Sequence, residues 1–221
     1  YGDHRDLHLS LRRQRQMCIR DSPKTMTSDY AAPLFCAGIT AYKAVKAAEP
    51  EKNKKIAIFG IGGVGHMAIQ FSKVAGCEVT GVSRKEKHLD VAKKLGADNI
   101  FVYSSNQEKF LNNLNENYGL FDAAIVFAPV DEVTDTAIKS IKKGGTVVIA
   151  TVGKIPNFLA FEEKTIRGTL IGSRKDMEDV IEIAEKNNFE VVTETFPLEQ
   201  ANEALQKLKT SDIEARAVLI P

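Results

Sequence analysis

Short apolar runs alternate with amphipathic stretches along most of this chain. The apolar runs predict six strands, at residues 56–59, 78–82, 99–102, 121–127, 146–151 and 167–172. The spacing of apolar residues between them predicts helices, at residues 64–71, 85–95, 106–115 and 133–142. Strands that alternate with helices at this spacing indicate an α/β fold, in which a doubly wound parallel sheet of six strands carries helices on both faces.

The pattern is different before the first strand and after the sixth. Apolar residues behind Pro33 predict a helix that begins near Gly38 and ends before Pro50. After the sixth strand the pattern predicts two further helices and two further strands, at residues 175–186, 191–196, 198–208 and 216–220. This tail has too few apolar residues to form a core alone, so we expect it to pack on the rest of the chain.

The first 22 residues do not share the pattern of the rest of the chain. They carry five arginines and two of the four histidines, without a sustained apolar period. The tract LRRQRQMCIRDS resembles translated sequencing-adapter sequence, so we interpret residues 1–22 as a non-native leader. The alternative is a basic arm that binds anions. The remaining domains are then residues 23–172, with the sheet and its leading helix, and residues 173–221, a C-terminal return segment.

Composition narrows the classes of partner. The net charge is +1 over 221 residues, without the basic field that nucleic-acid binding requires. No apolar run reaches the 18 or more residues of a transmembrane helix, so we expect no membrane partner and a cytoplasmic protein. Cys18, Cys36 and Cys77 are far apart and lack C-x-x-C spacing, which excludes a disulfide framework or a four-ligand structural zinc site built from them.

A glycine-rich turn joins the first strand to the helix after it. Its sequence is GIGGVG, with glycines at 60, 62, 63 and 65. Gly60 would allow a tight turn, Gly62 the close approach of backbone to a pyrophosphate, and Gly65 close packing of helix on strand. The helix N-terminus would offer N–H groups to the anion. The pattern predicts a dinucleotide site, and the competing interpretation is a turn with no ligand.

The end of the second strand indicates which dinucleotide. An acidic residue about 20 positions after the glycines typically holds the ribose of NAD, but this chain has Ser83, Arg84, Lys85, Glu86 and Lys87 there. A hydroxyl followed by cations binds a 2′-phosphate through charge-assisted hydrogen bonds, so we predict NADP(H), held by Ser83, Arg84 and Lys87. The alternative is the solvated start of a helix, with Glu86 able to turn toward the ribose.

Three separated motifs resemble one protein family. The turn GIGGVGH, the segment PLFCAGITAYKAVK before it and the terminal ARAVLIP are similar to the zinc-containing alcohol dehydrogenases of the medium-chain dehydrogenase/reductase superfamily, and within it to the NADP-dependent cinnamyl-alcohol-type enzymes. The resemblance covers about residues 24–221. It implies a Rossmann sheet, the C-terminal remnant of a GroES-like catalytic domain, and hydride transfer between NADP(H) and a primary alcohol or aldehyde with Zn²⁺.

The resemblance also assigns residues. It implies that Cys36 is a ligand of the catalytic zinc and that Thr40 lies near the nicotinamide, whereas Cys36 judged alone would be a small buried hydrophobe. His66 would be a satisfied structural histidine beside the phosphates. Arg216 would reach the pyrophosphate, or else be a surface arginine. Further cofactor contacts would be Gly63, Val64, Ala128, Thr151, Val152, Gly172 and Ser173.

The sequence also departs from the family pattern. The upstream domain that supplies a Cys and a His–Glu pair to the zinc site is missing, and Cys36 alone cannot hold catalytic zinc. We therefore expect a C-terminal portion of such an enzyme that binds NADP(H) and turns over nothing. Two alternatives remain: a zinc-independent quinone or enone reductase of the same superfamily, and a non-catalytic nucleotide-binding module. The family also implies a homodimer joined at the sheet edge, residues 167–172.

Overall fold

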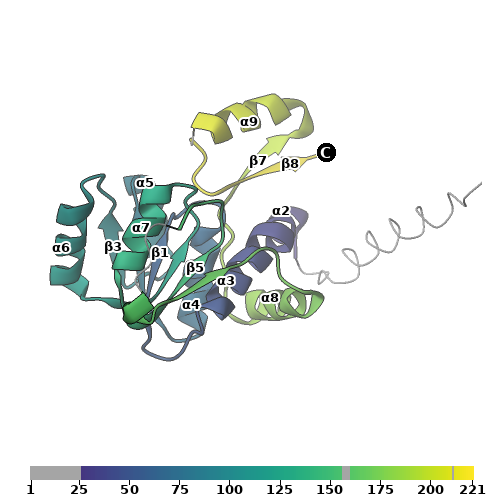
Figure 1. Cartoon of the computed structure of the whole chain (residues 1–221). Helices are drawn as coiled ribbons and strands as arrows, with labels where there is room; N and C mark the ends of the chain where they lie inside the picture. The colour runs from purple at the N-terminus through teal and green to yellow at the C-terminus, as the bar shows by residue number, and fades with distance from the viewer. Residues whose placement is uncertain (1–25, 156–159, 211) are drawn as a thin grey trace, which may run out of the picture.

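The core of the molecule is a six-stranded parallel sheet with strand order β3-β2-β1-β4-β5-β6. The computed structural model describes residues 26–155, 160–210 and 212–221 (Figure 1). The strands of the sheet are β1 (Lys55–Phe59), β2 (Glu78–Ser83), β3 (Asn99–Val102), β4 (Phe121–Val126), β5 (Ile141–Ile149) and β6 (Thr165–Gly168). The predicted α/β doubly wound sheet is confirmed, with β1 and β4 side by side at its centre.

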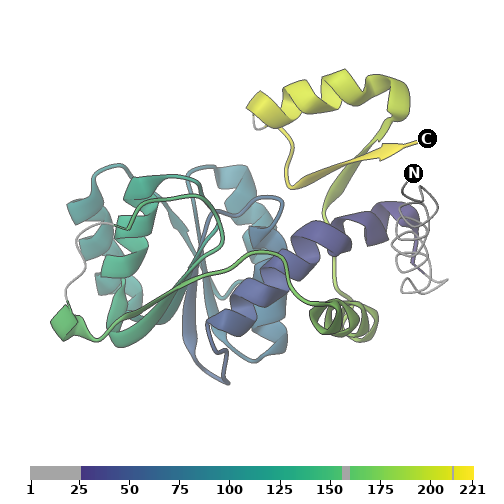
Figure 2. The same cartoon turned by 45° about the vertical axis from the view of Figure 1, so that its right-hand side comes forward.

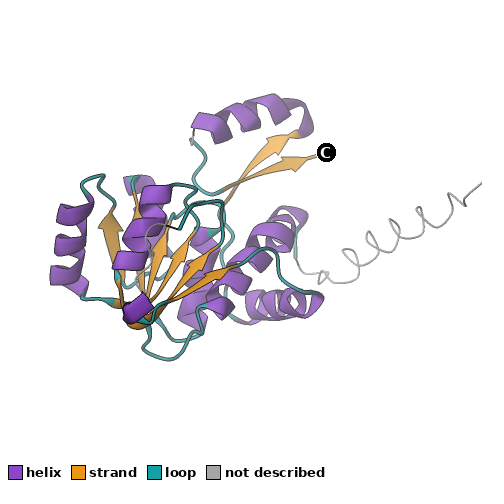
Figure 3. Cartoon of the chain, viewed as in Figure 1, coloured by secondary structure: helices purple, strands orange, loops and turns teal. Residues whose placement is uncertain are grey.

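Helices cover both faces of the sheet, as Figure 3 shows. Alternate residues of each strand face opposite sides: Ile56 and Ile58 belong to one apolar cluster, Ala57 and Phe59 to the other. The first cluster is completed by α3 (Ile39–Ala47), α4 (Gly65–Val74), α5 (Glu86–Lys94) and α8 (Arg174–Lys186). The second is completed by α6 (Gln107–Tyr118) and α7 (Asp131–Lys139). No helix in the described part of the chain is long and apolar enough to cross a membrane.

The leading helix begins ten residues earlier than predicted. It starts with α2 (Ser28–Pro33), passes through a π-helical segment, η1 (Leu34–Gly38), and continues as α3. The prediction that it begins near Gly38 is wrong because Pro33 lies inside the helix and does not precede it. Proline lacks the N–H that would bond to the carbonyl four residues earlier and crowds that carbonyl, so the defect that it causes lies within α2, before the π segment. Leu34 and Ala37 of η1 are buried in the core.

Two strand boundaries also differ from the prediction. β5 begins at Ile141 because that residue pairs with Phe121, and the register then shifts before Thr146 pairs with Ala123. Gly144, at φ +76°, takes up the irregularity inside the strand. At the sheet edge β6 ends at Gly168, since its partner strand β5 ends at Ile149. Residues 169–172, which were predicted to continue β6, therefore follow the strand, and Leu170 and Ile171 are exposed.

The C-terminal part forms a second, smaller layer. It contains β7 (Thr193–Pro197), η3 (Leu198–Gln200), α9 (Ala201–Thr210) and β8 (Arg216–Ile220), with β7 and β8 paired in parallel. Figure 2 shows this unit in yellow beside the end of α2. The apolar face of α8, with Met177, Val180 and Ile181, belongs to the main core. The expectation that the tail packs on the rest of the chain therefore holds for α8.

Candidate cofactor-binding site

A pocket of about 720 Å³ opens at the carboxyl ends of β1, β2 and β4. The chain leaves β1 toward β2 on one side, and β4 lies on the other, so the pocket is at the switch point where doubly wound sheets bind ligands. Its walls come from the glycine turn, the ends of β2 and β4, the start of α7 and the chain around β8. The residues outside the turn are Val82, Ser83, Arg84, Lys85, His88, Tyr103, Phe127, Ala128, Val130, Val133, Leu208, Thr210, Ala215 and Arg216.

Within the glycine turn, the backbone is closely packed at Gly60 and Gly65 and open at Gly62. Gly60 has φ +95°, and a Cβ there would lie 2.8 Å from the Ala128 nitrogen. A Cβ at Gly65 would lie 2.1 Å from the Gly60 carbonyl oxygen, so α4 can begin there only with glycine. A Cβ at Gly62 would meet nothing within 4 Å. Backbone at Gly62 is thus accessible from the pocket beside the N-terminus of α4, which is the arrangement that a diphosphate requires.

The C-terminal segment lies directly against this turn. A Cβ at Gly63 would lie 2.6 Å from Arg216 Cδ and 2.8 Å from the Ala215 carbonyl oxygen. The Arg216 side chain lines the pocket together with Gly62 and Gly63. Close approach of β8 therefore requires glycine at position 63, a role that the motif alone did not indicate.

The far end of the pocket is polar and carries no carboxylate among its described lining residues. Ser83 is buried; its Oγ accepts a hydrogen bond from the Lys85 N–H at 3.4 Å and lies 3.4 Å from His88 Nδ1. Burial lowers the pKa of His88, and the charges of Lys87 and Lys85 lower it further. Of the three residues predicted to hold the 2′-phosphate, Ser83 and Arg84 line the pocket and Lys87 does not. Lys85 and His88 also line the pocket, although they were not predicted to bind the phosphate.

His66 ties the glycine turn to a distant part of the chain. Its imidazole is fully buried, with Nδ1 2.9 Å from the Gly62 carbonyl oxygen. Because a carbonyl only accepts, Nδ1 carries the proton, and Nε2 accepts a hydrogen bond from the Val192 N–H at 3.4 Å. Burial lowers the pKa of His66 to about 4. A neutral imidazole with a hydrogen bond at each ring nitrogen is consistent with the interpretation of His66 as a structural histidine.

Several predicted cofactor contacts lie outside this pocket. Thr151 and Val152 follow β5, and the Val152 side chain points to solvent with 87% of its surface exposed. Gly172 packs against α3, since a Cβ there would lie 2.8 Å from Ile39 Cγ1. Ser173 is the N-cap of α8. Neither Gly172 nor Ser173 lines the pocket.

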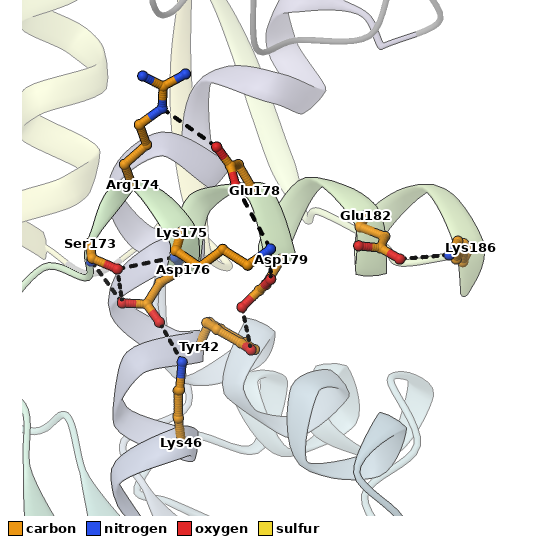
Figure 4. A network of polar contacts seen from close by, with 10 residues as sticks. All are labelled: Tyr42, Lys46, Ser173, Arg174, Lys175, Asp176, Glu178, Asp179, Glu182 and Lys186. Atoms are coloured by element: carbon orange, nitrogen blue, oxygen red, sulfur yellow. Dashed lines mark hydrogen bonds and ion pairs between the residues drawn. The ribbon is translucent and has the colours of Figure 1, made fainter.

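Ser173 belongs to a polar network around Asp176, shown in Figure 4. The Asp176 carboxylate accepts from the Ser173 N–H at 2.7 Å and from Lys46 Nζ at 2.8 Å, and only 2% of the residue is exposed. Burial alone would raise the pKa of Asp176, but Lys46 and Ser173 outweigh it and hold the pKa far below its usual range. Sequence reasoning missed this network, although Ser-x-x-Asp before an apolar helix is a capping-box signal.

Cys36 and Thr40 lie on the leading helix, apart from the pocket lining. Cys36 is exposed on η1, and Thr40 Oγ1 donates to the Cys36 carbonyl oxygen at 2.6 Å. Within the described residues no group of three His, Cys, Asp or Glu side chains could hold a metal ion. These residues alone do not fit a catalytic zinc centre. Cys77 is buried, with its thiol 3.4 Å from the Glu51 carbonyl oxygen, as expected of a core cysteine.

The sequence of this chain is similar to those of known dehydrogenases. Residues 63–186 match the family model of zinc-binding dehydrogenases. An alcohol dehydrogenase of Geobacillus stearothermophilus is 33% identical over 202 residues, which are 89% of this chain and 59% of that relative. The relatives include mannitol and cinnamyl alcohol dehydrogenases too, so the cinnamyl type is not singled out.

Solved structures show the same fold. The alcohol dehydrogenase of Aeropyrum pernix has a TM-score of 0.80 and 29% identity, over 90% of this chain and 60% of that one. Acetophenone reductase from Geotrichum candidum, solved in complex with NAD, has a TM-score of 0.81 and 27% identity, over 90% and 57%. This chain thus spans less than two thirds of the length of these relatives. The sequence match over residues 63–186, which include the second half of the glycine turn and strands β2 to β6, shows that the chain belongs to the zinc-binding dehydrogenase family.

Proposed function

We propose that the pocket binds NADP(H) and that this chain is the cofactor-binding part of a zinc-dependent alcohol dehydrogenase that transfers hydride between NADP(H) and a primary alcohol or aldehyde. One observation carries the proposal: Gly62 is open beside the N-terminus of α4, and the pocket that it opens into also holds Ser83 and Arg84. The glycine turn would bind the diphosphate of the cofactor, and the cationic end of the same pocket would bind the 2′-phosphate on its adenosine ribose.

The chain's own residues would bind and orient the cofactor. The first N–H groups of α4 and the guanidinium of Arg216 face the corner where a diphosphate would lie, and both favour negative charge. Val64 and Ala128 would limit the space next to it. When bound, the nicotinamide group would supply the hydride donor or acceptor. The apolar wall formed by Phe127, Val130 and Val133 would exclude water from one side of the pocket.

The choice of NADP(H) over NAD(H) rests on charge. A 2′-phosphate carries about two negative charges, and Arg84 and Lys85 are the cationic lining residues nearest to Ser83 in sequence. Glu86, the residue that could favour an unphosphorylated ribose, is exposed and does not line the pocket. Arg84 can form paired hydrogen bonds to a phosphate, which a carboxylate in its place would repel.

Other parts of the proposal concern the whole protein. Cys36, exposed on η1, would contribute one ligand to a zinc site whose other ligands belong to an upstream domain of the whole protein. β6 is the edge strand of the sheet, and Leu170 and Ile171 just beyond it are 78% and 58% exposed. An open edge with apolar neighbours supports a homodimer joined along β6. We assign residues 23–172 to the cofactor domain and residues 173–221 to the return segment.

Selectivity between cofactors tests the phosphate assignment. We expect Arg84→Ala to weaken NADPH binding about tenfold and to leave NADH binding unchanged, because only NADPH presents the 2′-phosphate. The matched control is Lys93→Ala, which removes an exposed cation from the same region, on α5, outside the pocket. Equal losses for NADPH and NADH in Arg84→Ala would contradict the assignment. Aldehyde reduction, measured with and without zinc, separates binding from turnover; we expect binding only.

A further inference from the structure

The connection from α8 to β7 ends with four residues without regular secondary structure, residues 189–192, which we call the crossover segment. Two side chains of α4 hold its backbone. Gln70 donates from Nε2 to the Glu190 carbonyl oxygen and accepts from the Glu190 N–H, both at 2.8 Å. One turn earlier on the same face, His66 Nε2 accepts from the Val192 N–H at 3.4 Å. Both side chains are buried. Their hydrogen bonds satisfy backbone groups of the crossover segment that would otherwise need water as a partner.

A second helix, α2, also holds the crossover segment. Tyr30 of α2 donates its hydroxyl to the Phe189 carbonyl oxygen at 2.6 Å. The Phe189 ring is buried and packs on Phe71 of α4, with ring centroids 4.6 Å apart. The crossover segment is therefore fixed by hydrogen bonds from two helices and by one buried aromatic ring.

The crossover segment is connected to the pocket through β7 and β8. Thr193, the first residue of β7, follows it and is the register partner of Arg216 in β8. Arg216 in turn lies against Gly63, within 2.6 Å of where a Cβ would be. The position of the Arg216 guanidinium in the pocket thus depends on where the crossover segment places β7.

His66 closes this chain of contacts into a ring. Its Nδ1 bonds to the Gly62 carbonyl, so one imidazole touches both the glycine turn and the crossover segment. Contacts run from Gly62 through His66 to Val192, along β7 to Arg216, and back to Gly63. The side chains of His66 and Gln70, which do not line the pocket, therefore fix the position of Arg216 relative to the glycine turn.

We infer that Tyr30, His66 and Gln70 are positioning residues for the cofactor site: they lock the crossover segment so that Arg216 is held over the glycine turn before any cofactor arrives. This inference rests on the proposed function. Without the lock, Arg216 would sample several positions, and the apparent affinity for the cofactor would fall by the fraction of time it spends away from the turn. The affinity effect must then disappear when Arg216 is absent.

A double-mutant cycle tests the inference, with the dissociation constant for NADPH as the readout. Gln70→Leu keeps the side-chain volume and removes both hydrogen bonds to Glu190. We expect it to weaken binding about fivefold, from the loss of competent population. Arg216→Ala alone should weaken binding about tenfold or more, since it removes a charge-assisted contact. In the Arg216→Ala background, Gln70→Leu should change the constant less than about twofold.

The control is Gln107→Leu. Gln107 makes three side-chain hydrogen bonds: its Nε2 donates to Asp135 at 2.6 Å and to Thr136 at 2.9 Å, and its Oε1 accepts from Lys139 at 3.0 Å. These bonds join α6 to α7, away from the crossover segment. Gln107→Leu should lose stability and keep its affinity for NADPH. If the losses in the Gln70 and Arg216 variants simply add, or if Gln70→Leu binds as well as the unaltered chain, the positioning role is wrong.

Two further measurements keep the outcomes separate. If Gln70→Leu does not fold, Tyr30→Phe replaces it in the cycle, because it removes one hydrogen bond and retains the ring. Hydrogen exchange should become faster in residues 189–197 of either variant and stay unchanged in β1. If the unaltered chain does not bind NADPH at all, both the proposed function and the positioning role are wrong. If the unaltered chain binds NADPH and Gln70→Leu binds it equally well, only the positioning role is wrong.

Discussion

Gly62 and Gly65 lie three residues apart in one turn, but a methyl group has a different consequence at each. At Gly62 it meets nothing in the protein within 4 Å, while at Gly65 it lies 2.1 Å from the Gly60 carbonyl oxygen. We expect Gly62→Ala to melt like the unaltered chain and to bind NADPH at least about tenfold more weakly, because the methyl group occupies space that the diphosphate needs. Gly65→Ala should lower the free energy of unfolding by about 2–3 kcal/mol.

Thermal unfolding and a cofactor titration of both variants check this expectation. A Gly62→Ala variant that is stable and binds NADPH normally would show that the diphosphate does not approach the backbone there. An unaffected stability of Gly65→Ala would show that the turn has room the structure does not give it.

The histidine that links the turn to the crossover segment predicts a pH dependence of stability. The pKa of His66 is about 4 in the folded chain, lowered by burial from an ordinary value of 6.5. A lowered histidine pKa means that folding favours the neutral ring, so its contribution is complete above the unfolded pKa and is lost as the pH falls toward 4. From about pH 7.5 to pH 5 the loss amounts to about 2 kcal/mol of unfolding free energy.

Urea unfolding at several pH values measures this loss. Other groups titrate in the same range, so the comparison is with His66→Gln, whose amide can still donate and accept but does not ionise. The slope of unfolding free energy against pH between 6.5 and 5 should be shallower in the variant. Identical slopes would contradict the buried, neutral state of His66.

At the scale of elements, one buried carboxylate, that of Asp176, links α8 to α3. Asp176 accepts from Ser173 of its own helix cap and from Lys46 of α3. Asp176→Asn replaces the carboxylate that accepts hydrogen bonds from the Ser173 N–H and Lys46 with a neutral amide. We expect it to lower the free energy of unfolding by about 1–3 kcal/mol. Glu178→Gln is the control on the same helix, because Glu178 pairs with Arg174 at the surface.

Denaturant unfolding of the two α8 variants separates the buried from the exposed carboxylate. Glu178→Gln should be indistinguishable from the unaltered chain. Equal losses in both variants would mean that the cap at Ser173 contributes nothing beyond surface charge.

The elements that sequence predicts well are those with one dominant signal. β1 to β4 are short, mostly apolar segments that end at turns, and their predicted bounds lie within one residue of the observed ones. The errors arise where a residue that usually breaks structure lies inside an element: Pro33 in the leading helix and Gly144 in β5. The apolar residues beyond Gly168 misled for a different reason: the neighbouring strand β5 ends at Ile149, so residues 170–172 have no partner strand among the described residues.

The candidate site divides in the same way. The glycine turn and the pair Ser83–Arg84 each lie in one short stretch, so a local motif is enough to find them. Arg216 was suggested only by the family resemblance. Tyr103, Leu208 and Thr210 also line the pocket, but they are brought there from distant elements by tertiary packing, for which the linear sequence holds no signal. The network around Asp176 had a local signal that was overlooked.

On the scale of the whole molecule, two layers meet at the pocket. The sheet supplies the glycine turn and the end of β2, and the smaller β7–β8 unit supplies Ala215 and Arg216. A cofactor held between them would contact both layers, so binding should depend on their relative placement. This dependence connects the proposed function with the role of the crossover segment.

A direct titration of the unaltered chain with NADPH, followed by nicotinamide fluorescence and repeated with NADH, tests the central claim. Saturable binding of one NADPH per chain, with NADH bound more weakly, is the result that the open glycine corner and the cationic end of the pocket predict. If NADPH shows no saturable binding, the pocket at the end of β1, β2 and β4 is not a dinucleotide site.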